Sequence, residues 1–436
     1  MKTNNAGRHI SFWTALSFIV ASMIGTGVFT SLGFQLMEIR SIFPLLMLWI
    51  VGGIVALAGA LTYGELGTAL PRSGGEYHLL SRIMHPSIGF AAGIVSATVG
   101  FTAPAVLAAI ALGSYLELVL PFLSQTFTAF FVIIILHYLH MTSLRWGTIF
   151  QDGSTGVKVG LIIIFIGFGL IIDQPQSISV MPKPGDHAIL LSPSFAIGLV
   201  WVSYAYTGWN SVIYVAGEIT DPKVNITKVM IVATTFVTVL YVLLNYIFLY
   251  STSVESMTGQ VDVGYIAGVQ IFGDIGGTMM GLGISIILLS TVSSYVYIGP
   301  RIMQIMGEDH GFLNILKHKN SNGIPINAFW IQLLLSILLI LSSSFEQILL
   351  YAGISLIITT TLTVISLFVL RHNEPELDRP YKVLGYPFVP ILYLIVNIWI
   401  LYFSFIESRL ESFVGMGIII VSMFAFFMFS GIKKNS

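Results

Sequence analysis

The sequence predicts an all-α polytopic membrane protein with twelve transmembrane helices. Hydrophobic residues make up 56% of the 436 residues and charged residues only 9%, against about a quarter charged in soluble domains. A soluble chain of this length could not bury so much apolar surface. The hydrophobic residues also gather in stretches of about 20, the length that a helix needs to cross a bilayer. We expect one membrane domain, residues 1–436, with no soluble appendage.

Each predicted span is a long apolar stretch bounded by polar or basic residues. The division between the ninth and tenth spans rests on the polar run at 342–347. The predicted spans are 11–33, 42–69, 88–112, 125–142, 154–172, 193–216, 229–250, 277–304, 326–343, 347–370, 386–406 and 412–431.

The basic residues predict the orientation of these spans. Fifteen of the nineteen Lys and Arg residues lie at the termini or in the loops near 71–87, 143–153, 217–228, 305–325 and 371–385. The opposite loops hold only Arg40, Lys183 and Arg409, and Lys158 lies inside the fifth span. Cytoplasmic loops are enriched in Lys and Arg. We therefore expect both termini in the cytoplasm and the protein in the plasma (inner) membrane.

The first span contains glycine where a membrane helix should be continuous. Gly25 and Gly27 flank Thr26 about halfway along it. Unwinding here would free three backbone N–H groups, which can hold a carboxylate together with the positive end of the following half-helix. The carbonyl near Met23 points the other way and suits an ammonium. A close contact between two helices is the alternative reading, since small residues are common at such contacts.

The sixth span carries a second candidate break, at 204–208, surrounded by aromatic residues. Unwinding at Thr207 and Gly208 would free the carbonyls of Tyr204 and Thr207 for the substrate ammonium. Tyr204 or Trp209 could cover a bound substrate, although either could equally pack within the bundle. Asn210 is polar at membrane depth, and we expect it to bond a neighbouring helix or the ligand.

Two breaks in matching places predict an internal repeat. Broken helices that meet near the membrane centre are typical of transporters built from inverted repeats. Five spans reverse the orientation of the next copy, so residues 11–172 would form the first repeat and 193–370 the second. Residues 386–431 would add two further helices. Main-chain groups at the two breaks could then recognise both ends of an α-amino acid.

Lys158 is an ionisable residue within a predicted span. Burying an ammonium at membrane depth costs several kcal/mol unless it is paired, so such a residue is a functional candidate. It could replace a coupling sodium ion and bond the backbone of the first broken helix. It could also change protonation during a transport cycle, because buried lysines lose protons readily. Snorkelling of its long stem to the cytoplasmic boundary is the alternative.

Other site classes find little support. The chain has no cysteine, which excludes disulfides and thiolate sites. His137 and His140 share a helix face near the cytoplasmic end of the fourth span, but without a third ligand we expect interfacial histidines and no metal. No cofactor motif, no basic patch for nucleic acid and no catalytic constellation is evident. Glu65 and Glu218 should pair with basic residues at helix ends.

Several motifs in order resemble the amino acid–polyamine–organocation superfamily of transporters. Residues 22–29 read Ser-Met-Ile-Gly-Thr-Gly-Val-Phe, residues 71–77 Pro-Arg-Ser-Gly-Gly-Glu-Tyr, and residues 204–210 Tyr-Ala-Tyr-Thr-Gly-Trp-Asn. The similarity is greatest to the L-type amino acid transporter branch. It implies a LeuT-like bundle of five plus five helices with helices 1 and 6 broken, and a ligand between the breaks. The substrate-binding residues that it implies are Met23, Gly25, Thr26, Gly27, Tyr204, Thr207, Gly208 and Asn210.

The resemblance also implies a mode of transport. Lys158 matches the lysine of sodium-independent members. Thr207 replaces a glycine of the family pattern, which suggests a smaller or more polar substrate, and Tyr204 replaces a phenylalanine. Animal members use an outside cysteine to join a heavy subunit, so we expect this chain to work without one. Valine at Gly25 or Gly27 is expected to abolish binding.

The sequence therefore predicts a sodium-independent secondary transporter or exchanger of neutral L-amino acids, working by alternating access. A proton-coupled symporter or antiporter of amino acids or polyamines is the alternative, as is an amino acid sensor that does not transport. Polyamines and cationic amino acids would need acidic residues facing the pocket, and the central spans offer none. An enzyme is not expected.

Overall fold

The computed structural model describes residues 10–142 and 145–430, with the backbone alone at 145–154. The regular secondary structure of the described residues is helical, and their one β-bridge pairs Ile10 with Ile219. The elements are α1 (Phe12–Met23), α2 (Gly27–Glu38), α3 (Ile42–Ala69), α4 (Gly75–Ile83), α5 (Pro86–Val95), η1 (Ser96–Thr102), α6 (Ala103–Val119), α7 (Gln125–Thr142), α8 (Arg145–Leu170), α9 (Asp186–Ile189), α10 (Pro193–Ala205), η2 (Ser211–Glu218), α11 (Pro222–Ser251), α12 (Val254–Met257), α13 (Val263–Asp309), η3 (Gly311–Lys317), α14 (Ile326–Ser342), α15 (Phe345–Asn373), α16 (Phe388–Glu407) and α17 (Arg409–Ser430).

Nine of the helical segments in the described chain are long and apolar enough to cross a membrane. Two of them join consecutive elements, α1 with α2 and α5 with η1 and α6. Three further apolar helices are shorter, at Thr155–Leu170, Pro193–Ala205 and Ile326–Ser342. The predicted division between the ninth and tenth spans is confirmed, since α14 ends at Ser342 and Ser344 begins α15 with a capping box to Gln347.

The prediction that residues 251–276, between the seventh and eighth spans, form an outer loop is wrong in part. The segment contains the short helix α12 and the first turns of α13, which is 47 residues long. Gly273, at φ 72°, interrupts α13 without ending it. Glycines and an aspartate dilute the hydropathy of this stretch, and for this reason the helix is not evident in the sequence. The predicted loop at 71–87 likewise contains α4.

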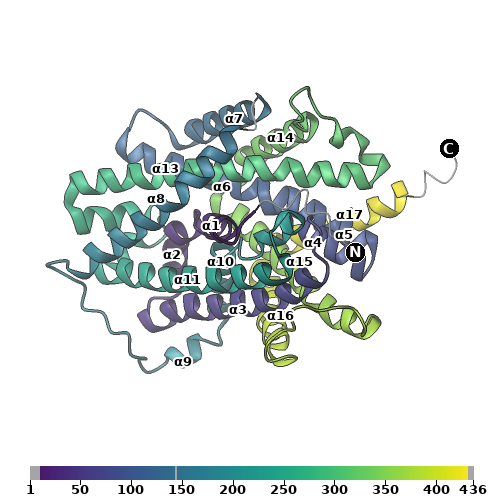
Figure 1. Ribbon diagram of the computed structural model, residues 1–436. Coiled ribbons are helices and arrows are strands. Elements are labelled where there is room, and N and C mark those ends of the chain that lie inside the picture. Colours follow the sequence, from purple (N-terminus) through teal and green to yellow (C-terminus); the bar gives the residue numbers. More distant parts are fainter. Residues whose placement is uncertain (1–9, 143–144, 431–436) are drawn as a thin grey trace.

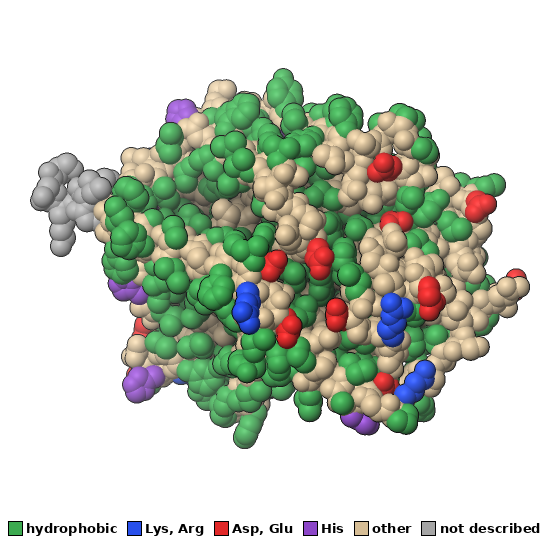
Figure 2. Space-filling model, turned by 180° about the vertical axis from the view of Figure 1, so that it is seen from behind, with side chains coloured by type: hydrophobic (Ala, Val, Ile, Leu, Met, Phe, Trp, Pro, Cys, Tyr) green, Lys and Arg blue, Asp and Glu red, His purple; other side chains and the backbone are tan. Residues whose placement is uncertain are grey.

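Hydrophobic side chains cover much of the outer surface, as Figure 2 shows for one face. On α7 they include Phe127, Phe131 and Tyr138, and on α16 Ile398 and Tyr402, all more than half exposed. A surface of this kind is the reverse of a soluble protein's and suits contact with lipid.

Ion pairs connect the loops that the basic residues assign to one side. Arg72 contacts Asp309, Arg82 contacts Glu374, Lys223 contacts Asp378 and Lys319 contacts Glu308. These residues belong to the loops 71–87, 217–228, 305–325 and 371–385. The four loops therefore gather at one end of the bundle. The termini, residues 1–9 and 431–436, lie outside the described residues.

Glu65 forms the most buried ion pairs at this end. Its carboxylate accepts two hydrogen bonds from Arg371, one of them 2.8 Å from Nε, and lies 3.4 Å from Nε of Arg379. The backbone N–H of Val383 donates to it at 2.8 Å. The predicted pairing of Glu65 with basic residues is confirmed, and it connects α3 to the end of α15 and to the loop before α16.

The broken helices occupy the middle of the bundle. Figure 1 shows α3 and α11 running side by side, with α1 and α10 near the centre of the view. Helix α1 packs against α11 and α8, whereas α10 packs against α2, α3, α15 and α16. Both breaks are consequently enclosed by other helices, as unwound backbone at membrane depth requires.

Candidate functional site

The first break is short and leaves backbone donors unused. Helix α1 ends at Met23, and α2 begins at Gly27. Among the described residues, no acceptor bonds the N–H groups of Gly25, Thr26 and Gly27, although all three residues are buried. Buried N–H groups without a partner are costly. They sit at the N-terminus of α2, where the helix dipole favours an anion.

The second break is longer. Helix α10 ends at Ala205, residues 206–210 form turns, and η2 continues as a 3-10 helix. Gly208 has φ 102°, a conformation that favours glycine. The carbonyl of Tyr204 already accepts the backbone N–H of Thr207 at 3.0 Å and its hydroxyl at 2.6 Å.

The two breaks touch each other. A Cβ on Gly208 would lie 2.7 Å from the carbonyl carbon of Ser22, and one on Gly27 would lie 2.5 Å from Cα of Ala205. Gly27 thus makes the close helix contact that the sequence left open as an alternative. Gly25 differs, because a Cβ there would meet only the Thr291 methyl group, at 3.4 Å.

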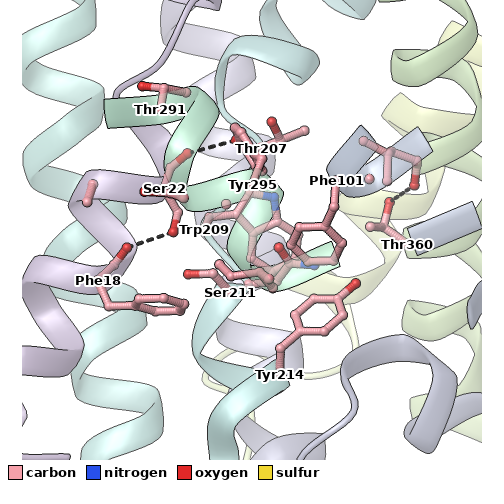
Figure 3. Close-up of a pocket in the computed structure, with 17 residues that line it drawn as sticks. Phe18, Ser22, Phe101, Thr207, Trp209, Ser211, Tyr214, Thr291, Tyr295 and Thr360 are labelled. Atoms are coloured by element: carbon pink, nitrogen blue, oxygen red, sulfur yellow. Dashed lines mark hydrogen bonds between the residues drawn. The ribbon is translucent and has the colours of Figure 1, made fainter. Parts of the chain in front are cut away.

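A cavity that is partly open to solvent lies beside the meeting point. Figure 3 shows Phe18 and Ser22 of α1 on one side of it and Phe101 and Thr360 on the other. The hydroxyl of Tyr295 donates to the Ser22 carbonyl at 3.3 Å. The predicted residues that line this cavity are Thr207, Gly208, Trp209 and Asn210.

The other predicted binding residues are not among the described residues that line this cavity. Gly25, Thr26 and Gly27 follow Ser22 in the chain and are buried. The carbonyl of Met23 accepts a hydrogen bond from the Tyr241 hydroxyl. Tyr204 lines a second, smaller cavity, which shares Thr207 and Trp209 with the first. Trp209 packs edge-on against Tyr63 with ring centroids 4.7 Å apart, so it faces α3.

Lys158 is held by hydrogen bonds inside the bundle. Its side chain is 1% exposed. Its Nζ donates to the Ala21 carbonyl at 3.3 Å and to the Thr291 hydroxyl at 3.0 Å. The predicted bond to the first broken helix is confirmed, and snorkelling is excluded by these contacts.

Sequence reasoning allowed that Ser293 and Ser294 of α13 could line the region near Lys158, but it missed Thr291, Tyr295 and Ile298. Thr291, Ser294, Tyr295 and Ile298 all line the cavity. Their spacing places them on one face of a helix, and three polar groups on one face of an apolar span were the available signal. Phe101 and Gly100 also line it, from the π-helix η1, which no pattern in the sequence indicated.

The two histidines are not interfacial, contrary to expectation. His137 and His140 are buried, at 0% and 2% exposure. Nε2 of His140 lies 2.9 Å from the Ser293 hydroxyl, and Nδ1 of His137 lies 2.8 Å from the Ile133 carbonyl. They pack α7 against α13 and α14 because α7 turns this polar face inward. The Ser293 hydroxyl therefore bonds His140, and the hydroxyl that bonds Lys158 is that of Thr291.

Asn210 bonds a neighbouring element. Its Nδ2 donates to the carboxylate of Glu76 in α4. The hydroxyl of Tyr214 donates to the other oxygen of the same carboxylate. Asn210 and Tyr214 both line the cavity, so Glu76 lies directly behind its wall.

Comparison with known proteins identifies the family. Residues 10–432 match the family model described as amino acid permease. Similar relatives include the Asc-type amino acid transporter 1 of Homo sapiens, 26% identical over 438 residues and covering 97% of this chain and 82% of the relative. The large neutral amino acids transporter small subunit 2 of Mus musculus is 25% identical over 431 residues, 97% and 81% of the two chains. The serine/threonine exchanger SteT of Bacillus subtilis (strain 168) is 26% identical over 441 residues, 99% and 98%.

The match extends over nearly the whole chain, so the resemblance to the superfamily is confirmed. A permease is a transporter and not an enzyme, and the apolar helices agree with a multi-pass membrane protein. With two broken helices, a cavity between them and a family match from residue 10 to 432, the chain belongs to the amino acid permease family.

Proposed function

We propose that this protein is a sodium-independent transporter or exchanger of neutral L-amino acids, working by alternating access. The observation that carries the proposal is the buried ammonium of Lys158 between the Ala21 carbonyl and the Thr291 hydroxyl. In transporters with broken helices, carbonyls at a helix end coordinate the coupling cation. Here the side-chain nitrogen of Lys158 lies against the backbone of the first broken helix in a comparable way, which supports transport without sodium.

Substrate recognition would use the two breaks differently. The unpartnered N–H groups at 25–27 support binding of the carboxylate. The carbonyls of Tyr204 and Thr207 are the candidates for the ammonium. No Asp or Glu is among the described residues that line the cavity, which favours neutral side chains over cationic ones.

The cavity favours a small substrate. Thr207 stands where the family pattern has glycine, and its side chain lines both cavities. One relative is named for large neutral amino acids and another is named a serine/threonine exchanger, and both names support neutral substrates. We infer that small neutral amino acids, such as serine, threonine and alanine, are the substrates, and that exchange is the mode.

The membrane arrangement belongs to the same proposal. The nine long apolar segments and three shorter apolar helices together support twelve crossings. Breaks in the first and sixth of these support two inverted repeats, 11–172 and 193–370, followed by two additional helices. The gathering of basic loops at one end supports cytoplasmic termini in the plasma (inner) membrane. Without cysteine, the protein would work without a disulfide-linked heavy subunit.

Proteoliposomes containing the purified protein test this directly. A panel of radiolabelled amino acids is offered with and without an internal amino acid, in sodium and in potassium buffers. We expect uptake of small neutral amino acids that requires internal substrate and is equal in both salts. Steep sodium dependence would refute the role of Lys158, and binding without uptake would make the protein a sensor.

A further inference from the structure

Residues 73–76, just before and at the start of α4, bind the unwound half of the second broken helix at four points. The Gly217 N–H donates to the Ser73 hydroxyl at 3.1 Å, and the Gly74 N–H donates to the Tyr214 carbonyl at 3.2 Å. The side chains of Asn210 and Tyr214 donate to the Glu76 carboxylate. We call this set of bonds between 73–76 and 210–217 the inner contact.

The backbone of this loop is built to bring Glu76 close. Gly74 and Gly75 both have positive φ, at 127° and 58°, which glycine adopts without strain. Gly75 also lies against the face of Tyr214, where a Cβ would come within 2.6 Å of three ring carbons. Only glycine allows this approach, so the paired glycines before Glu76 serve the inner contact.

The carboxylate of Glu76 is buried without a counter-charge. The residue is 3% exposed. Besides Asn210 and Tyr214, the hydroxyl of Tyr63 on α3 donates to it at 3.1 Å. The titratable groups that face it are Tyr63 from α3, Tyr214 from η2 and Tyr393 from α16. No Lys, Arg or His in the described chain contacts it, and on α15, Arg371 is engaged by Glu65.

Burial of such a carboxyl favours its protonated form. Hydrogen bonds from neutral donors offset only part of the cost of removing an ionised carboxylate from water. Burial is the largest influence here and raises the pKa of Glu76, which lies outside the membrane spans, although the three donors act in the opposite direction. Parting of the inner contact would expose the carboxylate to the solvent-connected cavity and return its pKa towards the ordinary value.

We propose that Glu76 is a proton-binding site that controls the inner contact and hence opening of the cavity towards the end of the bundle that carries α4. When Glu76 holds a proton, the inner contact stays closed. When Glu76 loses the proton to water, the ionised carboxylate favours hydration, and the 210–217 segment is released. The sign follows from linkage: the closed state has the higher pKa, so acid stabilises it and rising pH opens it.

This inference rests on the proposed function only in taking the cavity as the substrate path. Asn210 and Tyr214 form part of the cavity wall and also bond Glu76. A change in the charge of Glu76 therefore acts on the wall through these two side chains. Glu76 is a positioning residue for the cavity, and a purely structural role would give it no dependence on pH.

The absence of cysteine makes a direct test available. Ser211 lines the cavity, and its hydroxyl is without a partner among the described residues, so Ser211→Cys should be tolerated. The rate at which a maleimide labels this single thiol reports how often the segment opens. The rate is measured from about pH 5.5 to about pH 8 with Glu76 and with Glu76→Gln, and the ratio of the two rates cancels the thiol's own titration.

Glutamine imitates the protonated acid. We expect the two proteins to be labelled at equal rates at low pH. As the pH rises, the rate for the Glu76 protein divided by the rate for Glu76→Gln should increase. The total increase should be about tenfold for each unit by which the pKa of Glu76 differs between the closed and open states. Glu255→Gln, a matched change at an exposed carboxylate in α12, should leave the profile of the Glu76 protein unchanged. A ratio that stays constant across this range would overturn the proposal.

A second variant covers the possibility that Glu76→Gln does not fold. Tyr214→Phe removes one donor of the inner contact and leaves Glu76 titratable. It should label faster than the parent at low pH, while its labelling still responds to pH. Labelling identical to the parent at every pH would show that the inner contact does not restrain the segment.

Transport assays separate this inference from the proposed function. The labelling experiment needs no substrate, so it remains decisive even if no amino acid is transported. Where transport is observed, Glu76→Gln should flatten the pH dependence of the maximal rate and change KM little. A pH profile identical in the two proteins would refute the inference and leave the proposed function intact.

Discussion

The two helix breaks are alike in position and different in what they offer. The first, at 24–26, is short, and among described groups its N–H donors have no acceptor. The second, at 206–210, is longer, and the hydroxyl and N–H of Thr207 already occupy the Tyr204 carbonyl. The first break therefore offers unused main-chain dipoles, whereas the second offers side chains to the cavity. Under the proposed function, the carboxylate that all amino acids share would bind at the first break, and side chains such as Thr207 at the second would contact the rest of the substrate.

Gly27→Val should have the largest effect, because its side chain would collide with the backbone of α10 beside Ala205. We expect a loss of about 3 kcal/mol or more of stability and no transport. The reason is packing between the breaks and not the filled carboxylate site that the sequence suggested. Gly25→Ala is the matched control, since its Cβ meets only an ordinary contact with Thr291, and it should change stability by less than about 1 kcal/mol. Thermal unfolding in detergent measures both, and equal losses would contradict the distinction.

Lys158→Ala should slow transport by about thirtyfold, the equivalent of about 2 kcal/mol for lost hydrogen bonds to a charged group. The half-helix before the first break would lose its bond at the Ala21 carbonyl, although Lys158 itself is not among the described residues that line the cavity. Substrate binding should weaken less than turnover falls. Calorimetric binding beside proteoliposome uptake checks this, and an unchanged turnover would remove Lys158 from the mechanism.

Thr207→Gly should change which substrate is preferred more than how fast it moves. The change widens the cavity at the second break and removes the hydroxyl bond to the Tyr204 carbonyl, while the backbone N–H bond to it remains. We expect the preference for a large over a small neutral amino acid to rise by about tenfold, the scale for one or two buried methyl groups. Competition of leucine against serine uptake measures it. A uniform change for both would mean that the second break does not set specificity.

Tyr241→Phe should have the smallest effect. It frees the Met23 carbonyl at the end of the first half-helix, at a cost of about 1 kcal/mol for the lost hydrogen bond. If that carbonyl receives the substrate ammonium, substrate affinity should rise in this variant. Unchanged affinity would restrict the first break to carboxylate binding and so sharpen the contrast between the breaks.

The sequence predicted the features that composition and glycine placement control. Both breaks lie where Gly25, Gly27 and Gly208 stand, and Lys158 bonds the first broken helix as expected. Glycine marks unwound backbone, and an isolated cation in an apolar span must find partners. These inferences need only local sequence.

The contributions from unbroken helices could not be predicted in the same way. Thr291 and Tyr295 reach the cavity because α13 crosses the first break, a relation set by tertiary packing. The burial of His140 depends on Ser293 from a helix about 150 residues later. Glu76 appeared only within a family motif, because its contacts to Asn210 and Tyr214 join residues 134 and 138 positions apart in the chain.

The arginine pair around Glu65 has a mechanical consequence for α16. One carboxylate anchors the end of α15 and, through the Val383 N–H, the loop that leads into α16. The start of α16 is thus tied to the end of α3. The two cannot separate at this corner unless a buried ion pair and the Val383 hydrogen bond break, so they should move as one unit.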